Sequence, residues 1–176
     1  MIIEAIVGDI TKQTTDVIVN AANSTLLGGG GVDGAIHAAA GIALVEECYG
    51  IPIGPYGRCQ TGQAVMTNAY KLPCKKIIHT VGPVYRACDE CGEAELLALC
   101  YSNSLISADE EGYSSISFPC ISTGVYGYPK DKAAKIAVAS VRLSLKTAKN
   151  INHVVFVCFD NYNYKLYTEL LKLDCK

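Results

Sequence analysis

The chain has 176 residues, half of them hydrophobic, and a formal net charge of −2 with a pI near 5.9. This length predicts a single domain, residues 1–176, and the slightly acidic balance argues against a broad nucleic-acid-binding surface. No apolar run reaches the roughly 18 residues of a membrane helix, and the basic start of a signal peptide is lacking, so we expect a cytoplasmic protein that does not bind membranes.

Apolar, β-branched runs alternate with amphipathic segments along the chain. The runs predict short buried strands, and the segments, with their 3.6-residue period, predict helices that cover a sheet. This alternation predicts an α/β fold with a mainly parallel sheet in three layers. The expected strands are residues 2–7, 17–21, 64–67, 76–81, 115–118 and 153–158; the expected helices are 33–40, 43–49, 93–111, 130–145 and one around 166–171.

Nine cysteines occur without regular spacing. This odd number predicts reduced thiols rather than a disulfide framework. Cys88 and Cys91 form a C-x-x-C pair in an expected loop, but the second ligand pair of a structural zinc site is absent. We therefore expect no metal site.

Four consecutive glycines, Gly28 to Gly31, stand just before Asp33 and a helical segment. Glycine lets successive backbone N–H groups point to one side, and a helix N-terminus adds free N–H groups and a positive dipole end. The run therefore predicts a loop that binds phosphate groups. The alternative is a flexible surface loop, but such loops lack the apolar flanks found here at Leu26, Leu27 and Val32.

Gly29, Gly31 and Gly34 also satisfy the pattern G-x-G-x-x-G of dinucleotide-binding dehydrogenases. That pattern belongs immediately after a strand, whereas residues 20–27 intervene here. The chain is also too short for an added substrate domain. A dehydrogenase is therefore not favoured.

The position of Asp33 allows two roles. It can cap the helix, or it can act on an uncharged part of a ligand whose phosphates the glycines hold. A carboxylate at a helix N-terminus is expected to stay ionised, which suits orienting a water but makes a weak base. His37, four residues later, lies on about the same helix face, although such a histidine is more often packed or solvent-facing than catalytic.

Further polar and aromatic residues follow predicted strands, so we expect them at one edge of the sheet. Asn20 and Asn23 either close a turn or bind ribose hydroxyls. Asp9 either forms an Asx turn or accepts the amine of an adenine. Phe159 either joins the core or stacks on a purine.

A second glycine-containing segment follows the strand predicted at 115–118. Ser122, Thr123 and Gly124, with Gly127, either form an ordinary tight turn or provide a second backbone grip on phosphate, with Tyr126 as a wall between them. Both interpretations stay open from the residues alone.

Taken together, these motifs resemble the macrodomain family, and most closely its MacroD-type branch, which includes bacterial O-acetyl-ADP-ribose deacetylases. The similarity covers nearly the whole chain. It implies a three-layer α/β/α macrodomain with a mixed, mainly parallel six-stranded sheet and a cleft for ADP-ribose. The segments that carry it are residues 8–11, 17–23, 27–37, 39–41, 61–62, 79–83 and 118–129.

The resemblance implies a role for individual residues. Asp9 would bind the adenine amine, Ile10 would offer a backbone contact and Phe159 would stack on the ring. Asn23 would orient the distal ribose, and Asp33 the attacking water. The diphosphate would lie between Gly30, Gly31 and Val32 on one side and Ser122, Gly124, Val125 and Tyr126 on the other.

The implied activity is hydrolysis of esters at the distal ribose. The substrates would be O-acetyl-ADP-ribose and proteins that carry mono-ADP-ribose on Asp or Glu side chains, with no cofactor. Two alternatives use the same pocket: a module that binds ADP-ribose without turnover, and a phosphatase acting on ADP-ribose 1″-phosphate.

Overall fold

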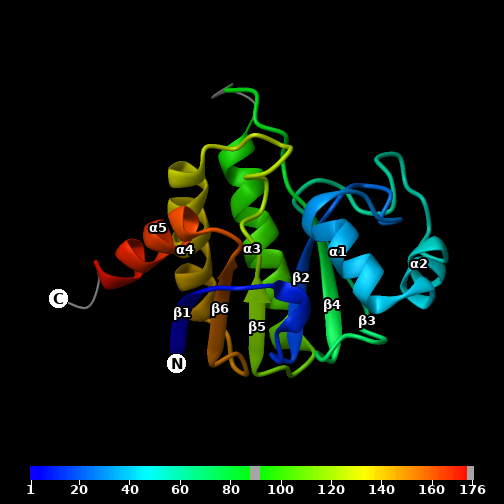
Figure 1. The fold of residues 1–176 in the computed structure, drawn as a ribbon, viewed down its shortest axis with the longest axis horizontal. Helices are drawn as coiled ribbons and strands as arrows, with labels where there is room; N and C mark the ends of the chain where they lie inside the picture. The colour runs from blue at the N-terminus through cyan, green and yellow to red at the C-terminus, as the bar shows by residue number, and fades with distance from the viewer. Residues whose placement is uncertain (88–91, 174–176) are drawn as a thin grey trace.

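The computed structural model describes residues 1–87 and 92–173. Within these residues, six strands form one sheet in the order β1-β6-β5-β2-β4-β3, and all neighbours are parallel except β3 and β4 (Figure 1). The mixed, mainly parallel sheet expected from the sequence is confirmed. The strands are β1 (Ile2–Val7), β2 (Val17–Ala22), β3 (Ala64–Asn68), β4 (Lys76–Val81), β5 (Ser115–Phe118) and β6 (His153–Cys158).

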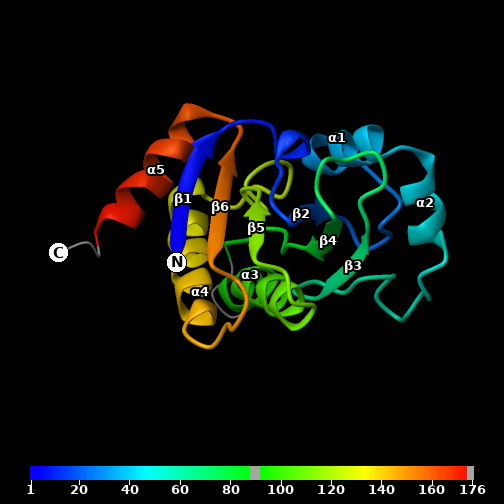
Figure 2. The ribbon, with the colours of Figure 1, turned by 90° about the horizontal axis from the view of Figure 1, so that it is seen from below.

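Helices cover both faces of the sheet and complete three layers (Figure 2). One apolar cluster joins the sheet to α3, α4 and α5, with Phe118, Phe156 and Tyr167 at its centre. A second joins the opposite face to α1 and α2, through residues such as Ile36 and Leu44. The helices are η1 (Ile10–Lys12), α1 (Gly31–Ala40), α2 (Ile42–Tyr49), α3 (Glu93–Glu110), α4 (Lys130–Leu145) and α5 (Asn161–Lys172).

Helix α1 begins two residues before the start predicted at Asp33. Gly30 is the N-cap in an extended conformation, with no side-chain capping bond, and Asp33 is the third helical residue. The capping role considered for Asp33 is therefore wrong, because the backbone has already entered the helix at Gly31. Its carboxylate is left available for other contacts.

The parallel strands bring their carboxyl ends to one edge of the sheet, next to the start of α1 (Figure 1). The register places Asn20 of β2 directly beside His79 of β4. Both are fully buried polar residues in otherwise apolar strands. Such residues need internal hydrogen-bond partners. Asn20 Nδ2 and both ring nitrogens of His79 have them, whereas Asn20 Oδ1 has none among the described residues.

Six cysteines within the described residues carry free thiols, as expected, and the Sγ atoms of Cys120 and Cys158 lie 4.0 Å apart. The Cys88 and Cys91 pair lies outside the described residues. No helix in the described part of the chain is both long enough and apolar enough to cross a membrane.

Candidate active site

The carboxylate of Asp33 is buried, with only 4% of the residue exposed. Its Oδ1 accepts a hydrogen bond of 2.7 Å from Asn20 Nδ2 and lies 3.4 Å from His37 Nε2. Burial raises the pKa of the Asp33 carboxyl above its ordinary value, although the Asn20 hydrogen bond and the His37 ring oppose this rise. The expectation of a weak base considered only the helix N-terminus; burial acts in the opposite direction and makes the carboxylate more basic.

The second oxygen of Asp33, Oδ2, is buried without a hydrogen-bond partner among the described residues. It lies under Gly29, where an added Cβ would be 3.1 Å from Asp33 Oδ2 and 3.1 Å from Asn23 Nδ2. The absent side chain of Gly29 therefore lets these two polar atoms approach the same point. The structure thus brings together the two residues predicted to be catalytic.

Asn23 has a local structural role at the start of the glycine loop. Its Oδ1 accepts from the N–H of Thr25 at 3.0 Å and from the Thr25 hydroxyl, and its Nδ2 donates to the Gly28 carbonyl at 3.0 Å. The turn-closing role considered for Asn23 is therefore present. The same contacts fix its amide group next to Gly29.

The glycine loop presents an open face beside the start of α1. Gly28 and Gly31 have φ angles of +95° and +59°, which favour glycine. A Cβ at Gly30 or Gly31 would meet nothing within 4 Å, so the space above the loop is free. The first N–H groups of a helix lack intrahelical partners, so this face suits an anion.

The segment after β5 forms a tight turn held by its own backbone bonds. Tyr128 N–H donates to the Ser122 carbonyl at 2.9 Å, and Gly127 N–H donates to Gly124 at 2.9 Å. Ser122 adopts a φ of +64° although it is not glycine, and Val125 is 97% exposed. A left-handed φ is costly for Ser122, and the exposed side chain of Val125 does not contribute to the core. Both features are typical of a turn that binds a ligand.

Asp9 and Phe159 follow the paired strands β1 and β6 at the other end of the edge, where Gly8 N–H donates to the Cys158 carbonyl at 3.0 Å. Hydrogen bonds from the Thr11 hydroxyl and N–H form an Asx turn and lower the pKa of Asp9, which keeps the carboxylate ionised. Ile10 is buried next to it. Phe159 is 90% exposed, so the core position considered for it is wrong.

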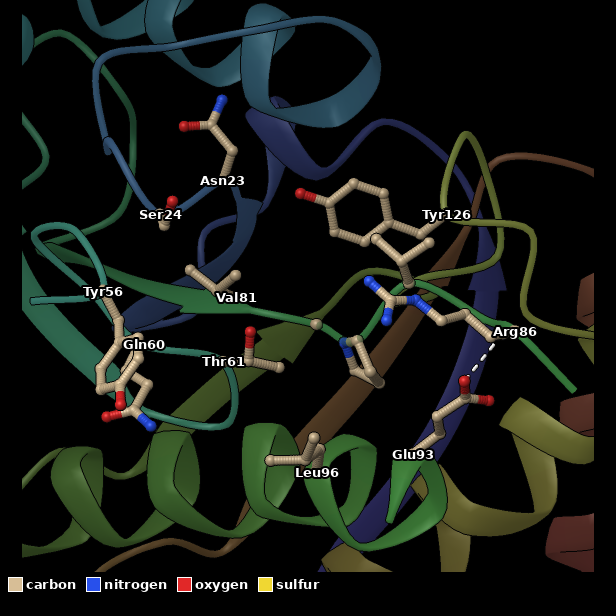
Figure 3. A pocket seen from close by; sticks show the side chains of 13 residues that line it. Asn23, Ser24, Tyr56, Gln60, Thr61, Val81, Arg86, Glu93, Leu96 and Tyr126 are labelled. Carbon is tan, nitrogen blue, oxygen red and sulfur yellow. Dashed lines mark hydrogen bonds between the residues drawn. The ribbon is translucent and has the colours of Figure 1, made fainter. Parts of the chain in front are cut away.

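A cavity of about 510 Å³ begins at Asn23 and Tyr126 and extends away from the glycine loop (Figure 3). It runs between the segment after β4 and the first turn of α3. The Glu93 carboxylate accepts a hydrogen bond of 2.7 Å from the Arg86 N–H at its far side. Other lining residues are Ser24, Tyr56, Gln60, Thr61, Val81 and Leu96.

A family model described as "Macro domain" matches residues 19–137. The chain belongs to the macrodomain family. This macrodomain is 53% identical over 168 residues to "O-acetyl-ADP-ribose deacetylase" of Klebsiella pneumoniae (strain 342), a match that covers 96% of this chain and 95% of the relative.

Solved macrodomain structures have the same fold. A mutant of the Oceanobacillus iheyensis macrodomain with ADPR is 46% identical with a TM-score of 0.90, covering 97% of this chain and 91% of that one. The Trypanosoma brucei macrodomain in complex with ADP-ribose is 41% identical with a TM-score of 0.85, covering 96% of this chain and 68% of that one.

One predicted site residue of this macrodomain does not lie at the cleft surface. Asn20, expected to bind ribose hydroxyls, is 0% exposed, and its Nδ2 donates to both Asp33 Oδ1 and His79 Nδ1. A direct contact with a ligand does not fit this geometry, because the amide lies beneath Asp33. Asn20 contacts the carboxylate instead.

The contacts of His37 with Asp33 and of His79 with Asn20 were missed by reasoning from the sequence, although a packed His37 was one of the two positions expected. His37 is packed beside Asp33, with its Nε2 3.4 Å from Asp33 Oδ1. His79 lies in β4, and its Nδ1 is 3.0 Å from Asn20 Nδ2. One available signal was the occurrence of single polar residues inside the apolar strands of this macrodomain. Buried polar groups of this kind are usually paired with one another.

Proposed function

We propose that the protein binds ADP-ribose and hydrolyses esters at its distal ribose, with O-acetyl-ADP-ribose as a substrate. The observation that carries this proposal is the approach of Asp33 Oδ2 and Asn23 Nδ2 to one point beside Gly29, next to a loop with an open, anion-favouring face. The relative from Klebsiella pneumoniae, named as a deacetylase, supports the proposed chemistry. The structures with ADPR and ADP-ribose support the proposed ligand.

The ligand would lie along the carboxyl edge of the sheet. Adenine would contact Asp9 and stack on the exposed ring of Phe159, with a backbone contact at Ile10. The diphosphate would lie between two sets of backbone N–H groups, and the distal ribose near Asn23. The two sets belong to Gly30, Gly31 and Val32 in the glycine loop and to Ser122, Thr123, Gly124, Val125 and Tyr126 in the second turn.

In the proposed reaction a water molecule attacks the acyl carbon of the ester. Asp33 accepts a proton from this water. The bond between the acyl carbon and the ribose oxygen then breaks, and the ribose oxygen takes the proton from Asp33 and becomes a hydroxyl. Acetic acid leaves with the oxygen and the second proton of the water, and it releases that proton to the solvent at neutral pH. The raised pKa of Asp33 makes its ionised form a better proton acceptor at neutral pH.

Access to Asp33 requires a small displacement of the loop, because Oδ2 lies buried under Gly29. We infer that ligand binding shifts this segment and exposes Oδ2 to the attacking water. The glycines on either side permit such a change at low conformational cost. The neighbouring side chain of Asn23 would then orient the ribose.

The replacement Asp33→Ala tests this proposal. Turnover of O-acetyl-ADP-ribose should fall by about 100-fold or more, the usual contribution of a positioned base. ADP-ribose should still bind in calorimetry, because the backbone N–H groups proposed to bind the diphosphate remain. Equal turnover by the variant and the parent protein would remove Asp33 from the mechanism. ADP-ribose binding without any turnover by the parent would favour a module that only recognises ADP-ribose.

We also infer that the enzyme removes mono-ADP-ribose from Asp and Glu side chains of proteins. The cavity of about 510 Å³ beside Asn23 and Tyr126 gives room for a group larger than acetyl on the distal ribose. Side-by-side assays should therefore show release of free ADP-ribose from a protein modified on acidic residues. Turnover of the acetyl ester alone would contradict this wider specificity.

Helix α3 offers a matched pair of variants for this test. Leu96 lines the cavity, whereas Leu99 lies on the same helix outside the lining and is 42% exposed. Leu96→Trp should lower turnover of the protein ester several-fold more than turnover of O-acetyl-ADP-ribose, because the indole would fill the cavity. Leu99→Trp should change neither. Equal effects of Leu96→Trp on both substrates would exclude the cavity from protein recognition.

A further inference from the structure

The amide of Asn20 joins two strands to the first turn of α1. Its Nδ2 donates one hydrogen bond of 2.7 Å to Asp33 Oδ1 and lies 3.0 Å from His79 Nδ1. An amide nitrogen has two N–H donors, so these two partners use both. Rotating the amide by 180° would place its oxygen against the carboxylate. The orientation of Asn20 is therefore set by the two acceptors on either side of it.

His79 provides one of these acceptors only in a single protonation state. Its Nδ1 must be unprotonated to accept from Asn20, so the ring proton lies on Nε2, which is 2.9 Å from the Thr67 hydroxyl. The residue is 0% exposed. Burial also lowers the pKa of His79 to about 3, which keeps the ring neutral at physiological pH.

Two other titratable groups of the described residues lie near this ring. Cys48 Sγ of α2 lies 4.0 Å from Nε2, and the His37 ring of α1 is 6.1 Å away between centroids. Burial raises the pKa of the Cys48 thiol to about 11, so it is neutral as well. The uncharged ring thus lies between Thr67 of β3 and Asn20 of β2.

We propose that His79 is a positioning residue for Asp33: as the neutral Nε2–H tautomer it orients the Asn20 amide, which in turn binds Oδ1 and leaves Oδ2 for the reaction. This inference rests on the proposed function of Asp33. It assigns a chain of three contacts, from Thr67 through His79 and Asn20 to the carboxylate. At metal sites, the loss of a partner that orients a ligand typically changes activity by about 10- to 100-fold, and we expect an effect of the same order here.

Two amide replacements at position 79 separate the two ring nitrogens. Asn carries its amide as close to Cβ as the imidazole carries Nδ1, so His79→Asn retains an acceptor for Asn20. Gln carries its amide one bond further out, where Nε2 lies, so His79→Gln retains a partner for Thr67 instead. Both variants replace an aromatic ring by a smaller amide, and both are expected to lower stability.

The expected result is a difference in kcat between these two variants. His79→Gln should lower kcat for O-acetyl-ADP-ribose by about 10-fold or more, with the Kd for ADP-ribose almost unchanged, whereas His79→Asn should retain at least about a third of the parent kcat. Equal losses in both variants, or full activity of His79→Gln, would overturn the proposal.

The pH profile gives a readout that a merely structural role would not move. The Asn20 hydrogen bond holds the pKa of Asp33 down, so its loss in His79→Gln should move the acidic limb of kcat to higher pH. His79→Asn should keep the limb of the parent protein. Ser117→Ala controls for lost stability, because it removes a buried hydroxyl of β5 that contacts Thr15. This variant should have a lower melting temperature and the same acidic limb as the parent protein.

The tautomer can also be measured without any substitution. Nitrogen-15 NMR of the imidazole at neutral pH should show a protonated Nε2 and an unprotonated Nδ1 for His79. The opposite tautomer, or a charged ring, would overturn the proposal even if both variants failed to fold. If the parent protein does not hydrolyse the ester, the proposed function fails, while the tautomer still tests the His79 contact separately.

Discussion

The carbonyl oxygen of Gly29 packs directly against the backbone of Gly34. A Cβ atom at position 34 would lie 2.6 Å from this oxygen, closer than real Cβ contacts allow. The glycine loop therefore rests on the first turn of α1, and the height of the loop above Asp33 depends on the missing side chain. This contact links a small helix residue to the position of the site.

Replacing Gly34 by Ala should displace the loop. In an unobstructed helix, Gly→Ala stabilises by up to about 1 kcal/mol, but here we expect destabilisation and a Kd for ADP-ribose raised by about 10-fold. Denaturant unfolding and calorimetry would measure the two effects. Ala38→Gly, at an exposed position of the same helix, should lower the free energy of unfolding by about 1 kcal/mol, because glycine has a low helix propensity, without changing the Kd. A more stable Gly34→Ala protein with normal affinity would contradict the contact.

A charged side chain at Gly30 should prevent binding. The space around Gly30 is open in the structure, so Gly30→Glu should fold normally while its carboxylate occupies the proposed diphosphate site. We expect ADP-ribose binding to become undetectable in calorimetry. Ala38→Glu adds the same charge on the exposed side of α1 and should bind normally. Retained affinity in Gly30→Glu would argue against the loop as the phosphate site.

Removing the charge of Asp33 should increase stability while it strongly lowers turnover. Because the folded pKa lies above the unfolded value, the ionised carboxylate costs stability once the pH exceeds its ordinary value of 3.8. Asp33→Asn keeps an oxygen for Asn20 and removes the buried charge. Its melting temperature at neutral pH should rise by about 2–4 °C. An unchanged or lower melting temperature would show that the carboxylate is well stabilised where it lies.

His79 should make the fold sensitive to acid. Its folded pKa of about 3 lies below the ordinary 6.5, so within this window the unfolded chain binds a proton that the folded protein does not. The free energy of unfolding should therefore fall as the pH decreases from 6.5 toward 3. Urea unfolding at several pH values between about 4 and 7 gives the free energy of unfolding at each pH. This free energy should change less steeply with pH in His79→Asn than in the parent. Identical slopes would mean that His79 does not contribute.

Much of the fold follows from local patterns in the sequence. The six strands match their predicted bounds to within one residue, because β-branched runs such as Lys76–Val81 are buried on both faces and leave no competing period. The start of helix α1 was predicted less accurately, at Asp33 instead of Gly31. Glycine carries no side chain that marks a cap, so the entry of the backbone into the helix at Gly31 has no local signal.

The candidate site was predictable at its edges more than at its centre. Asp9 and Phe159 could be located because each directly follows a strand that ends at the same edge. The burial of Asp33 could not, because it depends on Gly29 lying over the carboxylate and on Asn20 lying beneath it. Both contacts join residues from different elements, and no periodicity within one segment reports them. The effect of burial on acidity was missed for the same reason.

Strand β1 pairs with β6, so that Ile2 is opposite His153 and Val7 is opposite Cys158. Within the described sheet, the first strand in chain order therefore pairs with the last one. Asp9 and Phe159, which follow these two strands, reach the same edge only when this pairing has formed. Pairing between segments so far apart in the chain slows folding. We therefore expect the adenine end of the proposed cleft, which needs both β1 and β6, to form later than the contiguous glycine loop and the start of α1.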